Sequence, residues 1–158
     1  MIIDVDKGYQ NLLDAFAELG ASAILVGIRQ DKGSEVTDSG ATLAEIATFN
    51  EFGTRHIPAR SFLRSTVDEN ATEYSKLILE ATDRAVDGAN PERELGIIGL
   101  NIVKDVQLKI TKLKEPANAL ATQIAKGRKK HLPEGTLIDN PLIDTGRMRA
   151  SIDFEVQK

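Results

Sequence analysis

Few residues in this chain have the chemistry to act as a catalyst or to hold a metal ion. There are two histidines, His56 and His131, and no cysteine. Zinc sites need ligands at characteristic spacings, and two histidines without a supporting motif do not supply them. The lack of cysteine also excludes disulfides, thiolate-bound metals and a cysteine nucleophile. We therefore expect no metal and no cofactor, with both histidines as ordinary surface groups.

Two carboxylates, Glu51 and Asp144, are the remaining candidates for catalysis. Asp144 lies beside Thr145 and Gly146, and the sequence offers it no second carboxylate, histidine or metal ligand as a partner. The simpler interpretation is a helix N-cap or an Asx-type turn before a short helix that begins near Arg147. Dinucleotide-binding, Walker, nucleophile-elbow and His-Glu-x-x-His motifs are all absent. We expect a protein that is not an enzyme, with a small hydrolase or nuclease as a distant alternative.

The composition predicts one soluble domain over residues 1–158. A chain of this length buries about 68–70% of its unfolded surface, so it needs neither disulfides nor metals to hold a core. Its apolar fraction of 41% and charged fraction of 28% are typical of globular proteins. The net charge of −4 gives no reason to expect nucleic acid as the main partner. The first residues do not form a signal peptide, and no apolar run reaches the roughly 20 residues of a membrane span.

Charge is distributed unevenly along the chain. Residues 1–50 are acidic, whereas a basic run follows much later and consists of Lys126, Arg128, Lys129, Lys130 and His131. This run is either a solvated loop or one half of a pair of complementary surfaces on neighbouring subunits. Opposite charges fix register and orientation at an interface, which makes the second interpretation worth keeping.

An amphipathic helix and a strand are predicted in the first part of the chain. The helix has an i, i+3, i+4, i+7 stripe formed by Tyr9, Leu12, Leu13, Phe16 and Leu19. Gly20 is expected to end it. The β-branched, apolar run 22–28 predicts a strand, and the polar segment 29–41 predicts a long hairpin loop or a mobile arm.

A second helix is predicted from Thr42 to Phe52. Thr42 and Glu45 have the spacing of a capping box at its start, and Gly53 is expected to end it. At this C-terminal end we expect the Phe52 ring to be buried. Pro58 then predicts an extended chain immediately before it.

Two longer helices follow. The first has a stripe expected to be buried along its whole length, namely Val67, Ala71, Tyr74, Ile78, Ala81 and Ala85, and it ends at Gly88. Asn90 and Pro91 then have the types expected at an N-cap and at the first helical position. The second stripe is Leu95, Ile98, Ile102, Val106, either Lys109 or Ile110, and Leu113, and it is expected to continue to about residue 114. Gly96 and Gly99 lie one turn apart in this helix and predict a close contact with another helix or with the sheet.

The remaining segments complete the predicted fold class. Residues 117–125 predict a short helix, and the polar segment 127–140 predicts a loop. Residues 151–156 alternate apolar and polar types, which is typical of a half-buried strand. Together the elements predict an α+β fold, with a small antiparallel β-sheet packed against one or two long helices and with extended loops.

Three segments in this order resemble the neck and tail-completion proteins of long-tailed bacteriophages. The first is IATFNEFGT at 46–54 followed by IPARSFLR at 57–64, the second is PANALATQIAKG at 116–127, and the third is NPLIDTGRM at 140–148. The resemblance spans about residues 22–156. The chain departs from the family pattern at Ser61, where proline is common, and at Ala117 and Leu120, which replace prolines. These departures concern the local geometry of loops.

The resemblance implies a structural virion protein that acts by assembly. It implies an α+β subunit in a symmetric homo-oligomeric ring of six or twelve copies, joined to a connector or head-completion protein and to a tail tube or tail terminator protein, with DNA free to pass through the channel. Such a ring is assembled in the cytoplasm of a bacterial host. A tail terminator or head-completion connector is the nearest alternative, and a host-directed regulatory protein is a distant one.

Residues of these segments are the candidates for contacts between subunits. They are Glu51, Phe52, Gly53, Arg55, Pro58, Arg60, Phe62, Arg64, Lys126, Arg128, Lys129, Asp144, Thr145, Gly146 and Arg147. The charged members are able to pair either within one subunit or across an interface. The polar segments 29–41 and 127–140 are expected to order when the subunit docks on its partners.

Overall fold

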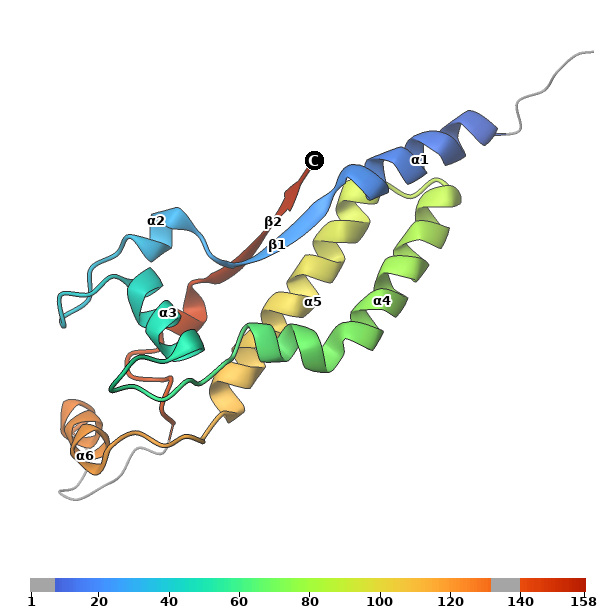
Figure 1. The fold of residues 1–158 in the computed structure, drawn as a ribbon. Coiled ribbons are helices and arrows are strands. Elements are labelled where there is room, and N and C mark those ends of the chain that lie inside the picture. Colours follow the sequence, from blue (N-terminus) through green and yellow to red (C-terminus); the bar gives the residue numbers. More distant parts are fainter. Residues whose placement is uncertain (1–7, 132–139) are drawn as a thin grey trace, which may run out of the picture.

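A long central helix organises the fold. The computed structural model describes residues 8–131 and 140–158. In chain order the elements are α1 (Tyr9–Ala21), β1 (Ala23–Ile28), α2 (Gln30–Gly33), α3 (Leu43–Phe52), α4 (Arg64–Val86), α5 (Pro91–Lys112), α6 (Leu120–Lys129), α7 (Arg147–Ala150) and β2 (Ile152–Gln157). Helices α4 and α5 form a hairpin, α1 lies across one end of it, and α2, α3 and α6 gather at the other end (Figure 1). The predicted α+β class is confirmed.

The sheet has two antiparallel strands among the described residues. Its register pairs Ala23 with Gln157 at one end and Ile28 with Ile152 at the other. An isolated pair of strands is marginal in water, and here α5 packs against both strands. The contact is close at Gly99, where an added Cβ would run into the ring of Phe154. The close approach predicted for the helix glycines is therefore confirmed at Gly99 but wrong at Gly96, which faces open space.

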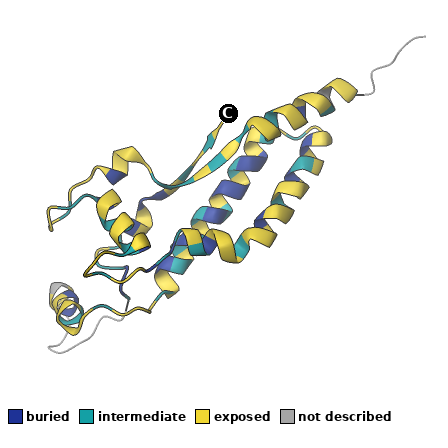
Figure 2. Cartoon of the chain, in the orientation of Figure 1, coloured by how far each residue is buried: buried dark blue, intermediate teal, exposed yellow. Residues whose placement is uncertain are grey.

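The core follows the buried side of α5. Ile98, Val106 and Ile110 on this helix have at most 1% of their surface exposed, and the line of buried residues is visible along α5 in Figure 2. The remaining members come from α3, α4, the segments around them and the C-terminal strand, and include Leu43, Phe62, Tyr74, Ala81, Leu142, Met148 and Ile152. Helix α4 contributes only one narrow stripe to this core.

Two predicted helix starts are confirmed. Thr42 accepts a hydrogen bond from the Glu45 backbone N–H, and the Glu45 carboxylate accepts one from the Thr42 N–H, which completes the capping box. Asn90 accepts from the Arg93 N–H with Pro91 at the first helical position. These local bonds satisfy backbone donors that a helix start leaves without partners.

The predicted end of the first helix is wrong by one residue. Helix α1 continues through Gly20 to Ala21, and Ser22 closes it. The Ser22 hydroxyl donates a 2.7 Å hydrogen bond to the Glu18 carbonyl oxygen. Because a side chain already satisfies a carbonyl of the last turn, the helix does not need a left-handed glycine to end.

The polar segment 29–41 is more structured than the predicted loop or arm. It contains α2 and an isolated bridge between Val36 and Thr42. Gly33 is buried, and a Cβ at this position would lie 3.3 Å from the Cβ of Ala44 on α3. The absence of a side chain at Gly33 thus lets α2 pack against α3, a contact that polarity alone does not reveal.

The fully buried stripe predicted for α4 is wrong at three positions, since Val67, Ala71 and Ile78 are exposed. Val67 and Ile78 have 43% and 48% of their surface exposed, whereas Tyr74, Ala81 and Ala85 are buried. Helix α4 packs mainly on α5, with α1 against it as well. The face of α4 that carries Val67 and Ile78 lacks the continuous cover that its apolar spacing predicted.

The short helix near residue 120 is displaced from its predicted position. Helix α6 spans Leu120–Lys129 rather than 117–125, so residues 127–129 belong to a helix and not to the predicted loop. Residues 132–139 of that predicted loop lie outside the described residues. The helix continues through Gly127, at a cost of about 1 kcal/mol relative to alanine, because Lys126 anchors this turn to the rest of the protein.

Candidate functional site

The three segments that carry the family resemblance meet at one end of the molecule, around the carboxylate of Glu51. This side chain is only 4% exposed. It accepts hydrogen bonds from the backbone N–H groups of Phe62, Leu63 and Arg64, at 2.8 to 3.0 Å. These donors lie at the start of α4, where an α-helix leaves N–H groups unpaired and its dipole favours negative charge. Glu51 is therefore an internal cap that joins α3 to α4.

The environment of Glu51 keeps it ionised. Burial alone would raise the pKa of this carboxyl, but hydrogen bonds from the Leu63 N–H, the Ser61 hydroxyl and the Arg64 N–H outweigh it and lower the pKa. The Arg64 side chain adds an ion pair at 3.0 Å. Ser61, which stands where the family commonly has proline, donates its hydroxyl to Glu51 at 2.7 Å. The departure from the family pattern thus supplies a hydrogen bond.

The turn between α3 and α4 depends on Gly53 and Arg60. Gly53 has φ +76°, and a Cβ there would lie 2.8 Å from the Ala59 nitrogen, so only glycine fits without strain. The buried Arg60 donates to the carbonyl oxygens of Pro116 and Ala117, at 2.6 and 3.0 Å. It therefore joins the first resemblance segment to the second. Burial lowers the pKa of the Arg60 guanidinium below its ordinary value.

Lys126 joins the second segment to the third. Its side chain is buried, and its Nζ donates to the carbonyl oxygens of Asn140, Pro141 and Ile143, at 3.1 to 3.2 Å. Asn140 in turn donates to the Ile110 and Thr111 carbonyls at the end of α5 and accepts from two backbone N–H groups after it. We did not predict from the sequence that the Asn140 side chain holds this turn, although an asparagine before a proline is a known signal for a turn.

The short helix expected near Arg147 is confirmed as α7, but a side-chain N-cap, one of the two interpretations of Asp144 to Gly146, is wrong. The residue before α7 is Gly146, which has left-handed backbone angles and no side-chain cap. Thr145 provides a hydroxyl that accepts only a long hydrogen bond, 3.4 Å, from the Arg147 N–H. Arg147 forms a 2.8 Å ion pair with Glu35 instead. The third segment is thus held to the polar segment 29–41 by charge rather than by a helix cap.

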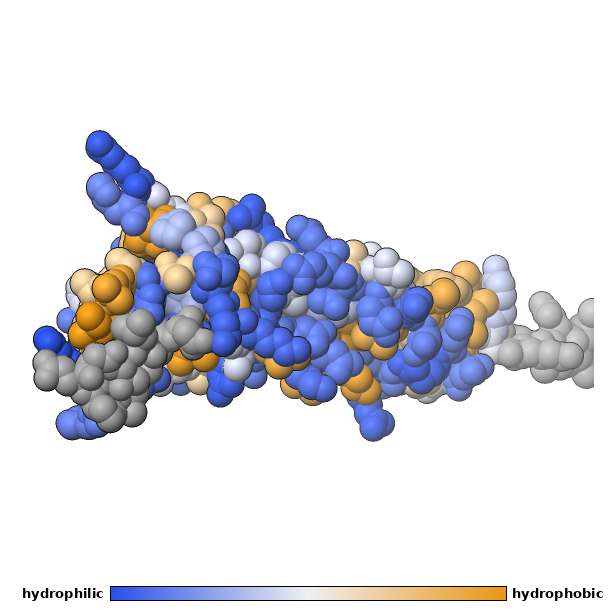
Figure 3. Space-filling view, turned by 90° about the horizontal axis from the view of Figure 1, so that it is seen from below, coloured by the Kyte–Doolittle hydropathy of each residue, from blue (hydrophilic) through white to orange (hydrophobic). Residues whose placement is uncertain are grey.

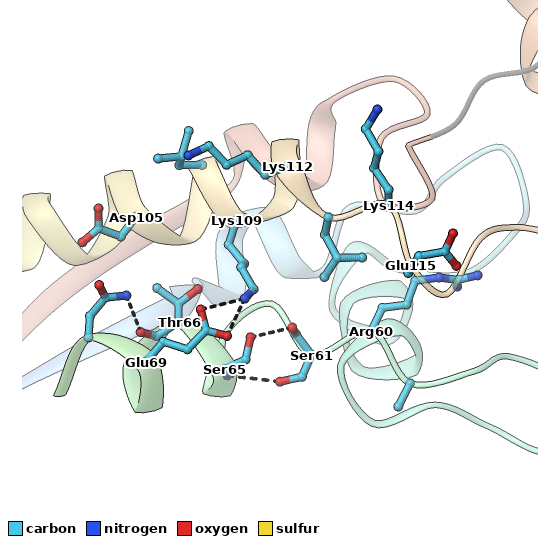
Figure 4. Close-up of a pocket in the computed structure, with 14 residues that line it drawn as sticks. Arg60, Ser61, Ser65, Thr66, Glu69, Asp105, Lys109, Lys112, Lys114 and Glu115 are labelled. Carbon is cyan, nitrogen blue, oxygen red and sulfur yellow. Dashed lines mark hydrogen bonds and ion pairs between the residues drawn. The ribbon is translucent and has the colours of Figure 1, made fainter.

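A groove of about 600 Å³ with a mixed polar and apolar lining runs between the start of α4 and the end of α5. Its floor includes Thr66, and its walls carry both signs of charge. Lys109 points to Glu69 and pairs with it at 2.6 Å, whereas Lys112 and Lys114 point away from that pair (Figure 4). Asp105 accepts a hydrogen bond from Tyr74. The nearest carboxylates are therefore engaged with partners in the fold, and the groove presents no matched acid and base.

Among the described residues, no group of three or more His, Cys, Asp or Glu side chains is placed to hold a metal ion. His56 and His131 are exposed and lie in different segments. Every buried side-chain nitrogen or oxygen in the described part has a hydrogen-bond partner.

Several candidates for subunit contacts have their side chains inside the fold. Glu51, Arg60, Phe62 and Lys126 are buried, and Gly53, Asp144, Gly146 and Arg147 are half-buried. The exposed members are Phe52, Arg55, Pro58, Arg64, Arg128 and Thr145, while the side chain of Lys129 lies outside the described part.

The predicted burial of Phe52 is wrong. Its ring is 61% exposed, and the Arg64 guanidinium lies over it at 4.5 Å from the centroid. Because α3 presents its neighbour Glu51 to the interior, Phe52 projects from the other side of the helix end.

Comparison with known proteins identifies no relative of this chain. No protein-family model matches the chain, and neither the curated proteins nor the solved structures contain a match. None of the described helices has the length and apolarity to cross a bilayer.

Many large apolar side chains are exposed on the described surface. Exposed large apolar side chains outnumber the buried ones in the described part, and they include Tyr9, Phe16, Leu25, Phe52, Leu79, Leu100 and Leu120. Figure 3 shows such side chains as patches between polar ones along the length of one face.

Proposed function

We propose that this protein is a non-enzymatic virion component that forms a ring at the neck or tail-completion site of a tailed bacteriophage. The observation that carries the proposal is the excess of exposed large apolar side chains over buried ones. A single subunit leaves this surface in contact with water at a free-energy cost of about 25 cal/mol per Å². Assembly with copies of itself and with neighbouring rings removes that cost.

The buried polar network supports the same proposal. Glu51, Arg60 and Lys126 connect the three resemblance segments through hydrogen bonds to backbone groups. Such a network fixes the relative positions of α3, α4 and α6 without using the apolar surface. A ring subunit needs this property, because its outer faces must keep their angles when they contact the next subunit.

A deletion in the viral genome tests the proposal. Removing the gene for this chain is expected to give filled heads and finished tails that do not join, and supplying the chain from a plasmid is expected to restore joined, infectious particles. Electron microscopy of both lysates gives the result. Joined and infectious particles without this chain would overturn the proposal. Loss of DNA packaging or of tail formation, instead of joining, would place it at the head-completion connector or at the tail terminator.

A further inference from the structure

Strand β1 has a free edge. Its six residues pair with β2 on one side. On the other side, no backbone hydrogen bond joins the strand to another segment of the described chain. In an antiparallel pair every second residue points its N–H and C=O groups away from the partner strand. These outward groups of β1 are an open template for a further strand.

The two strands of the sheet differ in how their residues protect an edge. Edge strands commonly carry charged residues or proline, which discourage pairing with another chain. Strand β2 contains Asp153 and Glu155, and its Phe154 N–H donates to the Asp153 carboxylate at 2.9 Å. Strand β1 has the sequence AILVGI, with neither a charge nor a proline. The free edge of β1 is therefore the one suited to accept a strand.

A mainly apolar groove of about 670 Å³ lies beside this edge. Residues 24–26 of β1 line it together with Leu63 and Val67 at the start of α4 and Ile102 of α5. A second hollow of about 190 Å³ shares Leu63 with the first and is lined by the last two residues of β1 and by Phe52. We call the two hollows together the β1 groove. The six residues of β1 have a length of roughly 20 Å, enough for an extended segment of about six residues.

The chemistry of the β1 groove selects an extended strand as its occupant. The edge offers donors and acceptors at every second residue, and another extended backbone matches them along its whole length. A helix uses its own N–H and C=O groups internally and cannot satisfy this edge. Side chains of an added strand alternate between the two faces of the sheet. Those on the inner face meet Leu63, Val67 and Ile102, so they should be apolar.

The outer face of the sheet specifies the other side chains of such a strand. On this face, opposite to the Phe154 ring that contacts α5, Leu25 is paired with Glu155 and Gly27 with Asp153. Neither carboxylate has an ion pair in the described part of the chain, and the two strands contain no basic residue. Lysine or arginine at the outward positions of an added strand would complement these charges.

The pattern required of the occupant also indicates its source. No extended segment in the part of the chain that the structure describes alternates apolar and basic residues in this way. A second copy therefore offers no matching strand among these residues, and the pattern points to another protein.

We propose that the β1 groove binds an extended segment of another protein, which adds to β1 as a third strand with apolar side chains inward and basic side chains outward. Backbone hydrogen bonds to β1 hold the segment in place. Val67 and Ile102 favour apolar side chains on its inner face, while Asp153 and Glu155 favour basic ones on its outer face. The inference goes beyond the proposed ring function and does not depend on it.

A peptide titration tests the occupant. The probe is a six-residue peptide of alternating valine and lysine with blocked ends, and the control peptide has three valines followed by three lysines. Both are titrated into the full-length chain and followed by NMR. The alternating peptide is expected to bind at least tenfold more tightly and to slow amide hydrogen exchange at every second residue of β1. Equal binding of the two peptides, or unchanged exchange in β1, would overturn the proposal.

Two methylated peptides test the backbone hydrogen bonds. One carries N-methyl groups on its three valines and the other on its three lysines, so each has a different edge that is unable to donate. Because an added strand turns only one edge toward β1, one methylated form should bind at least tenfold more weakly, and the other should bind as the parent does. Equal affinities of the two forms would rule out addition of a strand.

A matched pair of variants on α4 tests the groove. Val67→Lys places a charge on its wall and is expected to weaken binding of the alternating peptide at least tenfold. Ile78→Lys changes a residue of similar exposure on the same helix outside the lining of the groove, and should leave binding unchanged. Circular dichroism shows whether each variant is folded. Equal affinities of the two folded variants would contradict the proposed site.

The outer face and the source of the strand are tested last. Glu155→Lys is expected to weaken the valine–lysine peptide about fivefold at low salt and to strengthen a valine–glutamate peptide, and unchanged affinities would contradict the basic pattern. Mass measurement of the free protein examines the alternative occupant. A dimer that Val67→Lys dissociates, and Ile78→Lys does not, would mean that a second copy fills the β1 groove and would overturn the proposal.

Discussion

The hairpin of α4 and α5 and the opposite end of the molecule, where α3, α6 and α7 gather, differ in what fills their interiors. Apolar side chains such as Tyr74, Ile98 and Val106 fill the hairpin. At the other end three charged side chains, Glu51, Arg60 and Lys126, are buried and bind backbone groups. The residues that carry the family resemblance lie mostly in this second region. Glu51, Arg60 and Lys126 connect segments inside the fold, whereas many large apolar side chains of the described helices are exposed.

The largest expected effect comes from removing the carboxylate at the centre of the polar region. Glu51→Ala leaves the N–H groups of Phe62, Leu63 and Arg64 without an acceptor, and loss of a buried charged partner costs about 3–5 kcal/mol. We expect this loss in the free energy of unfolding measured with urea. The control is Glu45→Ala, which removes an exposed capping carboxylate and should destabilise the protein much less. Equal losses in the two variants would contradict the central role of Glu51.

The second largest expected effect comes from Lys126, whose hydrogen bonds hold α6 to the rest of the protein. Lys126→Met removes the donor for the Asn140, Pro141 and Ile143 carbonyls and is expected to cost about 2–3 kcal/mol, since buried acceptors are then unsatisfied. Lys130→Met, at an exposed position of the same basic run, should change stability by less than about 0.5 kcal/mol. Thermal unfolding compares the two. Similar melting temperatures would show that the Lys126 hydrogen bonds contribute little.

Two glycines of α5 probe the apolar region. Gly99→Ala places a methyl group against the Phe154 ring and is expected to destabilise by about 1–3 kcal/mol through overpacking. Gly96→Ala faces open space and should stabilise by up to about 1 kcal/mol, because alanine has the higher helix propensity. The denaturation midpoint of each variant, compared with that of the wild type, shows whether the substitution stabilises or destabilises the protein. If both substitutions destabilised the protein, the contact of α5 with the sheet would not explain the difference expected between Gly96 and Gly99.

The smallest expected effect is a fall in the stability of the fold at acid pH that comes from Glu51 in the polar region. The pKa of Glu51 is lower in the folded chain than its ordinary value, so its contribution to stability is complete above the pKa of the unfolded chain. As pH falls below about 4.5 and through the lowered pKa, this contribution is lost. Wild-type stability should therefore fall more steeply with acid than that of Glu51→Gln. Parallel pH curves would show that Glu51 is not the titrating group.

The elements could be predicted where local chemistry decides them. The Thr42 capping box, the Asn90 N-cap and the alternating strand near the C-terminus depend on neighbours in sequence, and all three are confirmed. Val67, Ala71 and Ile78 were expected to be buried because they belong to an apolar stripe, and Phe52 because it lies at a helix end, but all four are exposed. Periodicity reports which side chains are apolar, but the number of packed neighbours decides which of them are covered.

The polar interior could not be predicted for a related reason. A sequence shows Glu51, Arg60 and Lys126 as charges, and charges are seldom fully buried unless they are paired. Their partners are backbone carbonyl and N–H groups, which every residue carries and which therefore leave no mark in the residue types. Only the arrangement of segments 50–64, 116–126 and 140–143 brings these partners together. Surface pairing was the natural expectation for such residues, and the fold uses them as internal connectors.

The carboxylate that closes the start of α4 also determines what this helix end is able to attract. Exposed helix starts are common landing places for phosphate groups, because their N–H groups and dipole favour anions. In this protein Glu51 already occupies the place that a nucleic acid phosphate would take. The N–H groups of Phe62, Leu63 and Arg64 at this helix end are therefore already bound by a carboxylate and are not open to an outside anion.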